Sequence, residues 1–227
     1  MHVTILALGS RGDVLPYAAL GRGLRRAGHA VRLITFEGFR SLAEDRGLAF
    51  HSVPGDAAAL LATGAGLDLA ESGANVFGAY RAAMASFGRL AETYTAALSD
   101  PTLAETDVMV NQLPAGLFGA DLAEKYGVRH LQAAVIPLTM TRAFPLPGFP
   151  AWPARLPGYN RLTHRLMERL MWRGFRVAID RWRVSTLRLP PTREDAGAAL
   201  RRQRVPVLNG FSRHVVPRPE EAARLSA

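Results

Sequence analysis

Short apolar runs alternate with helical periodicity along the first 136 residues of the chain. The apolar runs predict five strands, over residues 3–8, 30–36, 48–53, 107–111 and 129–136. Between them, apolar residues recur every three or four positions and predict helices over residues 16–28, 39–46, 75–98 and 117–126. Strands and helices that alternate in this order predict a parallel sheet with right-handed crossovers. We therefore expect an α/β, Rossmann-like fold of about six or seven strands with helices on both faces.

The pattern changes after residue 136. Residues 137–159 hold six prolines with aromatic residues between them, which predicts an ordered loop or lid rather than a helix. A long helix is then predicted over residues 160–186, a short helix over 192–201 and a last strand over 205–209.

The last third of the chain is strongly basic. We expect residues 1–214 to form one Rossmann-like domain and residues 215–227 to begin a linker between domains. The net charge is +9, but residues 1–150 carry 12 basic and 13 acidic side chains, whereas residues 151–227 carry 16 and 6. Such a basic region would suit nucleic acid, an anionic membrane or an acidic partner domain.

The helix predicted over 160–186 concentrates this charge on one side. Its basic side holds Arg161, Arg165, Arg169, Arg173 and Arg176. The opposite side is apolar and holds Leu166, Met167, Leu170, Met171, Phe175 and Trp182. One interpretation is a helix packed on the sheet with a solvated basic face. The other is contact with an anionic membrane surface, which Trp172, near the arginines, would support. Nucleic acid is not expected, because no recognised binding module accompanies the charge.

The composition excludes several classes of protein and site. The chain contains no cysteine, which excludes disulfides and thiolate metal sites. No apolar run reaches the roughly 18 to 20 residues of a membrane span, and the first strand has no basic leader, so no signal peptide is expected. The six histidines are scattered singly, and we expect no metal site. A cytoplasmic protein is expected, with peripheral contact at the inner membrane face left open.

The segment between the first strand and the first helix carries candidate chemistry. It reads Gly9-Ser10-Arg11-Gly12-Asp13. Glycines at such a turn let the backbone bend sharply or approach a ligand. A helix beginning here directs backbone N–H groups to the carboxyl edge of the sheet, where open α/β sheets bind ligands. Asp13 has two interpretations from its position alone, as a helix cap or as a general base.

Two familiar nucleotide motifs do not fit this loop. The dinucleotide pattern G-x-G-x-x-G is absent from it, although Glu37 ends the second strand where a ribose-binding acid would lie. The P-loop pattern G-x-x-x-x-G-K-[ST] does not occur in the sequence. A nucleotide-binding oxidoreductase is therefore disfavoured.

The loop and later segments resemble a known family. Gly9-Ser10-Arg11-Gly12-Asp13-Val14-Leu15-Pro16 is similar to the N-terminal signature of the glycosyltransferase family 28 N-terminal domain, in the sterol glucosyltransferase and antibiotic glycosyltransferase group. Further agreement is found, in order, at Gly28-His29-Ala30-Val31, Tyr159-Asn160, Trp182-Arg183, Leu189-Pro190 and Asn209-Gly210-Phe211-Ser212.

The resemblance implies the GT-B architecture, in which two Rossmann-like domains face each other across a cleft. The N-terminal domain would bind the acceptor and the C-terminal domain the nucleotide sugar, a cosubstrate. Transfer would invert the anomeric centre without a metal or other cofactor. The resemblance implies that Asp13 is the general base, and that Gly9, Ser10, Arg11 and Gly12 lie near the donor phosphates.

The donor half of that family is not represented in this sequence, because its His-His-Gly-Gly-like motif and acidic sugar-binding pair are absent. We therefore expect an acceptor-binding half that is inactive without a donor domain in cis or in trans. The expected acceptor is a hydrophobic alcohol such as a sterol, a lipid or a polyketide-type aglycone. Its pocket is expected to be lined by Phe77, Tyr80, Met84, Phe144, Phe149 and Trp152. The alternative is a non-catalytic protein derived from this domain that binds a lipid or a partner.

Overall fold

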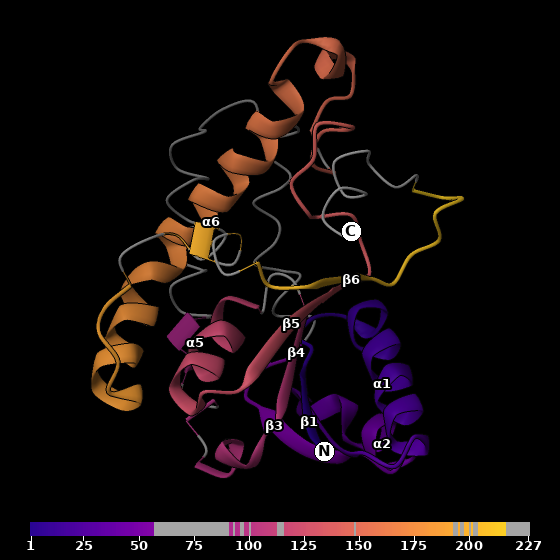
Figure 1. The fold of residues 1–227 in the computed structure, drawn as a ribbon, viewed down its shortest axis with the longest axis vertical. Coiled ribbons are helices and arrows are strands. Elements are labelled where there is room, and N and C mark those ends of the chain that lie inside the picture. The colour runs from indigo at the N-terminus through magenta and orange to yellow at the C-terminus, as the bar shows by residue number, and fades with distance from the viewer. Residues whose placement is uncertain are drawn as a thin grey trace.

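A single parallel sheet organises the molecule (Figure 1). The computed structural model describes residues 1–56, 91, 92, 94, 95, 98, 99, 101–112, 116–147, 149–192, 195, 198, 199, 201 and 204–216. Within these residues six strands pair in the order β3-β2-β1-β4-β5-β6, and every pairing is parallel. The predicted α/β, Rossmann-like fold is confirmed.

The strands follow the apolar runs closely. Their bounds are β1 His2–Leu6, β2 Ala30–Phe36, β3 Ala49–Val53, β4 Val108–Gln112, β5 Arg129–Ala134 and β6 Val207–Asn209. Leu6 of the central strand β1 pairs with Ile34 of β2 on one side and with Asn111 of β4 on the other. Strands buried on both faces are expected to be apolar throughout, which explains why simple apolar runs located them.

Helices cover both faces of the sheet (Figure 1). Their bounds are α1 Arg11–Arg26, α2 Arg40–Glu44, α5 Gly116–Tyr126 and α6 Tyr159–Trp182. One core cluster joins Val14 and Tyr17 of α1 to Ile5 and Leu33 of the sheet. The other lies on the opposite face and includes Leu6, Ile34, Met109, Phe118, Leu122, Phe175, Ile179 and Trp182.

The first helix was predicted to begin at Pro16, but it begins at Arg11. Ser10 is its N-cap and Asp13 its third residue, which is the spacing of a capping box. The cap overrides the preference of proline for the first turn. Pro16 therefore lies inside the helix. Because proline has no backbone N–H, one hydrogen bond of the helix is missing at this position.

Other predicted boundaries change in detail. The helix predicted over 39–46 is a 3₁₀ turn, Glu37–Phe39, followed by α2. A further 3₁₀ turn, Pro101–Glu105, precedes β4 and was not predicted. Most of the helix predicted over 75–98 lies outside the described residues, and the short helix predicted over 192–201 is described only in part.

The proline-rich segment is fastened to the start of α6. Asn160 Nδ2 donates to the Arg142 carbonyl at 2.7 Å, and Thr163 Oγ1 accepts from the Leu146 backbone N–H at 2.9 Å. His164 Nε2 lies 3.3 Å from the carbonyl oxygen of Phe144. Prolines remove N–H donors from this segment, so side chains of α6 provide partners for its backbone.

The predicted basic helix is confirmed as α6, extended by a π-helical turn, Arg183–Leu187. Trp172 is partly buried and packs against the core cluster. One detail of the helix faces was wrong, because Leu166, predicted on the apolar side, is exposed. The reason is that the first turns of α6 project beyond the sheet (Figure 1) and bury polar side chains against the proline-rich segment.

Candidate functional site at the carboxyl edge of the sheet

The loop between β1 and α1 is held by the strands on both sides of β1. The backbone N–H of Ala7 donates to the Ile34 carbonyl of β2 at 3.1 Å. The N–H of Leu8 donates to Gln112 Oε1 at the end of β4, at 2.7 Å. Both contacts lie at the carboxyl ends of parallel strands, where ligands of open α/β sheets bind. The loop therefore has a fixed position at the carboxyl edge of the sheet.

Asp13 caps its own helix through one carboxylate oxygen. Its Oδ2 accepts from the Ser10 backbone N–H at 2.8 Å and from Ser10 Oγ at 2.8 Å. Neither bond uses Oδ1. The side chain is half-buried at the N-terminal end of α1. Asp13 was considered from the sequence as the cap of a helix beginning at Pro16. It instead belongs to the capping box of a helix that begins at Arg11 with Ser10 as N-cap, and its Oδ1 takes no part in these bonds.

The two glycines of the loop have different reasons to be glycine. Gly9 has φ +148°, and a Cβ atom there would lie 2.5 Å from Asp13 Oδ2 and 2.7 Å from its Cγ. At Gly12, which is exposed, a Cβ atom would meet nothing nearer than Ser10 Oγ at 3.6 Å. Gly9 is thus needed to make room for Asp13, whereas no described neighbour requires a glycine at position 12.

Tyr17 ties the start of α1 to the middle of the sheet. Its hydroxyl donates to the Ala133 carbonyl of β5 at 2.6 Å. Burial raises the pKa of Tyr17 well above its usual value, and the negative charge of Asp13 adds to this effect. Tyr17 therefore stays neutral and anchors the helix that carries the loop. Arg11, at the first position of α1, is exposed at the same edge.

Two amide residues at the end of β4 were missed by sequence reasoning. Gln112 holds the loop through Leu8, as described above. Asn111 is fully buried, and within the described part of the chain neither its Oδ1 nor its Nδ2 has a hydrogen-bond partner. Its amide lies against Gly119 of α5, where any Cβ atom would overlap it. The available signal was two amides that close an apolar strand.

The residues predicted to line an acceptor pocket are only partly described. Phe77, Tyr80 and Met84 lie outside the described residues. Phe144 and Phe149 are half-buried, and Trp152 is largely exposed in the 3₁₀ turn Trp152–Arg155. A shared pocket lined by all six side chains stays a prediction.

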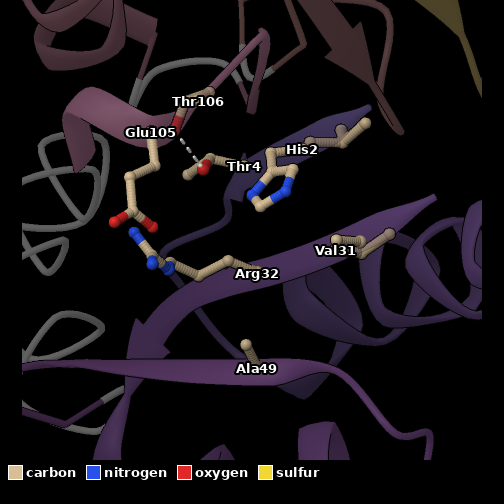
Figure 2. Close-up of a pocket in the computed structure, with 9 residues that line it drawn as sticks. His2, Thr4, Val31, Arg32, Ala49, Glu105 and Thr106 are labelled. Atoms are coloured by element: carbon tan, nitrogen blue, oxygen red, sulfur yellow. Dashed lines mark hydrogen bonds between the residues drawn. The ribbon is translucent and has the colours of Figure 1, made fainter. Parts of the chain in front are cut away.

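A small cavity lies at the opposite, amino edge of the sheet (Figure 2). Its volume is about 210 Å³, and its walls include Thr4, Arg32 and Glu105, of which the last two turn toward each other in the figure. Thr4 Oγ1 and Thr106 Oγ1 lie 2.7 Å apart at its rim, and Arg32 binds the Thr102 carbonyl at 2.9 Å. None of the predicted site residues lines this cavity.

Trp182-Arg183 is one of the segments that carried the family resemblance. It connects the end of α6 to α5 and to the carbonyl of Pro190. The buried Arg183 guanidinium forms ion pairs with Asp121 and Glu124 of α5, and its Nε donates to the Pro190 carbonyl at 2.8 Å. Burial raises the pKa of Asp121 to about 7, although the charge of Arg183 opposes this shift. This segment has a structural role in docking α6 on α5.

Two kinds of feature are absent from the described residues. No group of three or more His, Cys, Asp or Glu side chains among them is placed to hold a metal ion. None of the described helices has both the length and the apolar character needed to cross a membrane.

Known proteins resemble this chain in sequence and in fold. Residues 3–145 match the model of the glycosyltransferase family 28 N-terminal domain. The sterol 3-beta-glucosyltransferase of Candida albicans is 32% identical over 220 residues, which are 95% of this chain and 14% of that protein. The enzyme of the same name from Pichia angusta is 34% identical over 215 residues, 94% of this chain and 16% of that protein. The chain thus spans about a seventh of the length of these relatives.

Solved glycosyltransferase structures share the fold. SsfS6, a glycosyltransferase of Streptomyces sp. SF2575, superposes with a TM-score of 0.50 at 17% identity, covering 86% of this chain and 49% of that one. The glycotransferase of kitacinnamycin gives a TM-score of 0.51 at 16% identity, covering 95% of this chain and 47% of that one. The fold, the loop motif and the match over residues 3–145 agree, and the chain belongs to the glycosyltransferase family 28 N-terminal domain family.

Proposed function

We propose that this chain is the acceptor-binding half of an inverting, metal-independent nucleotide-sugar glycosyltransferase, with Asp13 as general base. The observation that carries the proposal is the geometry of Asp13. Its carboxylate lies at the carboxyl edge of the sheet and is held in place through Oδ2 alone, by two bonds from Ser10. A base needs a fixed position and a free lone pair, and Oδ1 supplies the second.

The proposed reaction is a single displacement. The acceptor hydroxyl oxygen attacks the anomeric carbon as its proton passes to Asp13 Oδ1. The new C–O bond forms on one face of the sugar while the bond to the diphosphate breaks on the other, and the electron pair leaves with the phosphate oxygen. A positioned carboxylate typically contributes about 10²- to 10⁴-fold to such a proton transfer.

The leaving diphosphate requires positive potential, which the same loop can provide. The N-terminus of α1 carries free N–H groups and a partial positive charge, and Arg11 adds a full charge beside it. The exposed backbone at Gly12 lets an anion approach closely, since no side chain intervenes. The donor itself would be held by a second domain, in cis or in trans.

The acceptor we propose is a hydrophobic alcohol. The curated relatives are named sterol 3-beta-glucosyltransferases, which is the first support. The second is the aromatic segment after β5, which leaves the functional edge of the sheet and is fastened on α6 by Asn160 and Thr163. Such a fixed apolar segment suits a rigid apolar acceptor better than a sugar or a peptide.

Reconstitution tests this function. The chain is combined with the donor-binding half of the Pichia angusta relative, supplied with UDP-glucose and a panel of sterol, lipid and polyketide alcohols, and the products are identified by mass spectrometry. We expect a glucoside of an apolar alcohol only when both halves are present. Transfer to water-soluble sugars but to no apolar alcohol would contradict the proposed acceptor class.

A further inference from the structure

We propose that the tip of the molecule, formed by the 3₁₀ turn Trp152–Arg155 and the first turns of α6, docks on the surface of an anionic lipid bilayer. The tip lies at one end of the longest axis, beyond the sheet (Figure 1). The proposal concerns where the chain acts and does not depend on the role of Asp13. It rests on the polarity, the rigidity and the charge of the tip.

The polarity of α6 is inverted at this end. The side chains that the first turns bury are Asn160, Thr163 and His164, which face the proline-rich segment. The side chains left in solvent are Leu162 and Leu166, with exposed fractions of 60% and 45%. A surface helix of a globular protein normally buries its apolar stripe, and the reverse arrangement marks a surface for an apolar partner.

Trp152 and Leu156, in the turn that precedes α6, add to this exposed apolar surface. They are 83% and 59% exposed, and they precede α6 directly. Tryptophan is the side chain best suited to the boundary between lipid headgroups and acyl chains, because it combines a large apolar ring with one N–H donor. Four large apolar side chains from two adjacent elements therefore share one end of the molecule.

Hydrogen bonds within the chain hold the backbone of the tip in place without a partner. The Tyr159 hydroxyl donates to the Pro150 carbonyl at 2.9 Å, and the Tyr159 backbone N–H donates to the Leu156 carbonyl at 3.2 Å. The N–H of Leu162 donates to the Gly158 carbonyl at 2.9 Å. Docking would consequently order few additional residues, which favours binding.

Arginines alternate along the chain with the apolar side chains of the tip. Residues 151–173 contain five arginines and one acidic residue, Glu168, which binds Arg201 at 2.7 Å. Arg155, Arg165 and Arg169 are exposed, and no described residue forms an ion pair with them. This charge is complementary to anionic headgroups.

The other end of α6 differs in charge. There Arg176 is paired with Asp180, and Arg181 is paired with Glu92. Unpaired cations and exposed leucines thus occur together only toward the start of the helix, within the described residues. Exposed apolar side chains flanked by arginines are the features of an interfacial membrane contact.

Vesicle binding tests the apolar part of the tip. The full chain is sedimented with vesicles of phosphatidylcholine alone or with one-third phosphatidylglycerol, at low and high salt. We expect binding to the anionic vesicles that salt reduces. Leu162→Ser with Leu166→Ser, or Trp152→Ser alone, should weaken it at least about tenfold. The matched control is Val177→Ser with Val184→Ser, which removes two exposed aliphatic side chains from the other end and should leave binding unchanged.

The charge is tested separately. Each arginine beside an anionic surface strengthens binding about fivefold, so Arg165→Gln with Arg169→Gln should weaken it about 25-fold. Arg22→Gln with Arg26→Gln on α1 removes the same charge elsewhere and should have little effect. Circular dichroism melting curves confirm that each variant is folded.

Three results would overturn the proposal. The first is wild-type chain that does not bind anionic vesicles. The second is equal loss in the tip variants and their controls. The third is a concentration-dependent dimer that the leucine variants dissociate, since the tip would then be an interface between copies of this chain.

Discussion

Gly9 and Asp13 fit together so closely that a Cβ atom at position 9 would lie 2.5 Å from Asp13 Oδ2 and 2.8 Å from Asp13 Cβ. The second contact is decisive, because the Cβ of Asp13 is fixed by the α1 backbone and cannot rotate away. From the sequence, Gly9 was expected to let a phosphate approach the backbone. In the structure, Gly9 is needed because a side chain there would overlap Asp13. The shape of the loop and the position of the proposed base are set by the same contact.

The two glycines should respond differently to alanine. Gly9→Ala combines this overlap with an unfavourable positive φ, and we expect it to lower the free energy of unfolding by about 2–3 kcal/mol. Gly12→Ala has room in the first turn of α1 and should stabilise the helix by up to about 0.5–1 kcal/mol. Urea denaturation of both variants measures these values. Equal effects at the two positions would show that the loop geometry is wrong.

Gly12→Ala also bears on the proposed donor site. If diphosphate lies against the exposed backbone there, the added methyl group should raise the KM for the nucleotide sugar in the reconstituted enzyme while the chain becomes no less stable. A variant with unchanged KM would place the donor away from this turn.

The Arg183 cluster should matter far more than a neighbouring surface ion pair. Arg183→Leu leaves the buried carboxyl of Asp121 without its counter-charge, and we expect a loss of about 3 kcal/mol in the free energy of unfolding. The control is Arg181→Leu, two residues earlier, which breaks an exposed pair with Glu92 and should cost no more than about 0.5 kcal/mol. Urea denaturation at pH 7 compares them, and similar losses would contradict a docking role for Arg183.

His130 should make the fold sensitive to acid. Burial lowers the pKa of His130 to about 4 from an ordinary value of 6.5. Between about pH 6.5 and pH 4, His130 is protonated in the unfolded chain but neutral in the folded chain. The free energy of unfolding therefore falls as the pH is lowered through this range. Because His130 is only partly buried, we expect it to lower the free energy of unfolding by about 2 kcal/mol at most over this range.

The raised pKa of Asp121 acts in the opposite direction between about pH 4 and 7, because there the folded state binds the extra proton. The difference between wild type and His130→Leu isolates the histidine, since Asp121 contributes equally to both. We expect the variant to lose less stability than wild type between pH 7 and pH 5. His214→Leu is the exposed control. Parallel pH curves for wild type and His130→Leu would contradict the assignment.

The sequence was sufficient for the sheet and for the location of the loop. Strands buried on both faces are apolar runs, and a glycine-bearing turn after the first of them marks the carboxyl edge of the sheet. The helix start was misplaced, because the cap formed by Ser10 and Asp13 competes with Pro16 and the outcome depends on local geometry. Gln112 could not be found as a support of the loop, since its partner Leu8 lies 104 positions away along the chain.

The start of α6 shows a different limit. Periodicity assigned Leu166 to a buried side, because leucines on a helix usually face the core. Here the neighbour is a proline-rich backbone with carbonyl groups to satisfy, so the helix turns Asn160 and Thr163 inward instead. Which side of a helix is buried depends on what packs against it, and a pattern of residues alone does not contain that information.

The most direct test of the central claim is the kcat/KM of Asp13→Asn in the enzyme reconstituted with a donor half. Asparagine keeps an oxygen for the bonds from Ser10 and so preserves the cap, but it does not accept the proton of a hydroxyl group. Ser10→Ala is the control, because it removes only the hydroxyl bond to Oδ2, while the backbone N–H of residue 10 still holds the carboxylate. We predict that Asp13→Asn lowers kcat/KM by about 10²- to 10⁴-fold with the free energy of unfolding within about 0.5 kcal/mol of wild type, while Ser10→Ala keeps most activity. Asp13→Asn enzyme that retains near wild-type turnover would contradict the account and reduce Asp13 to a helix cap.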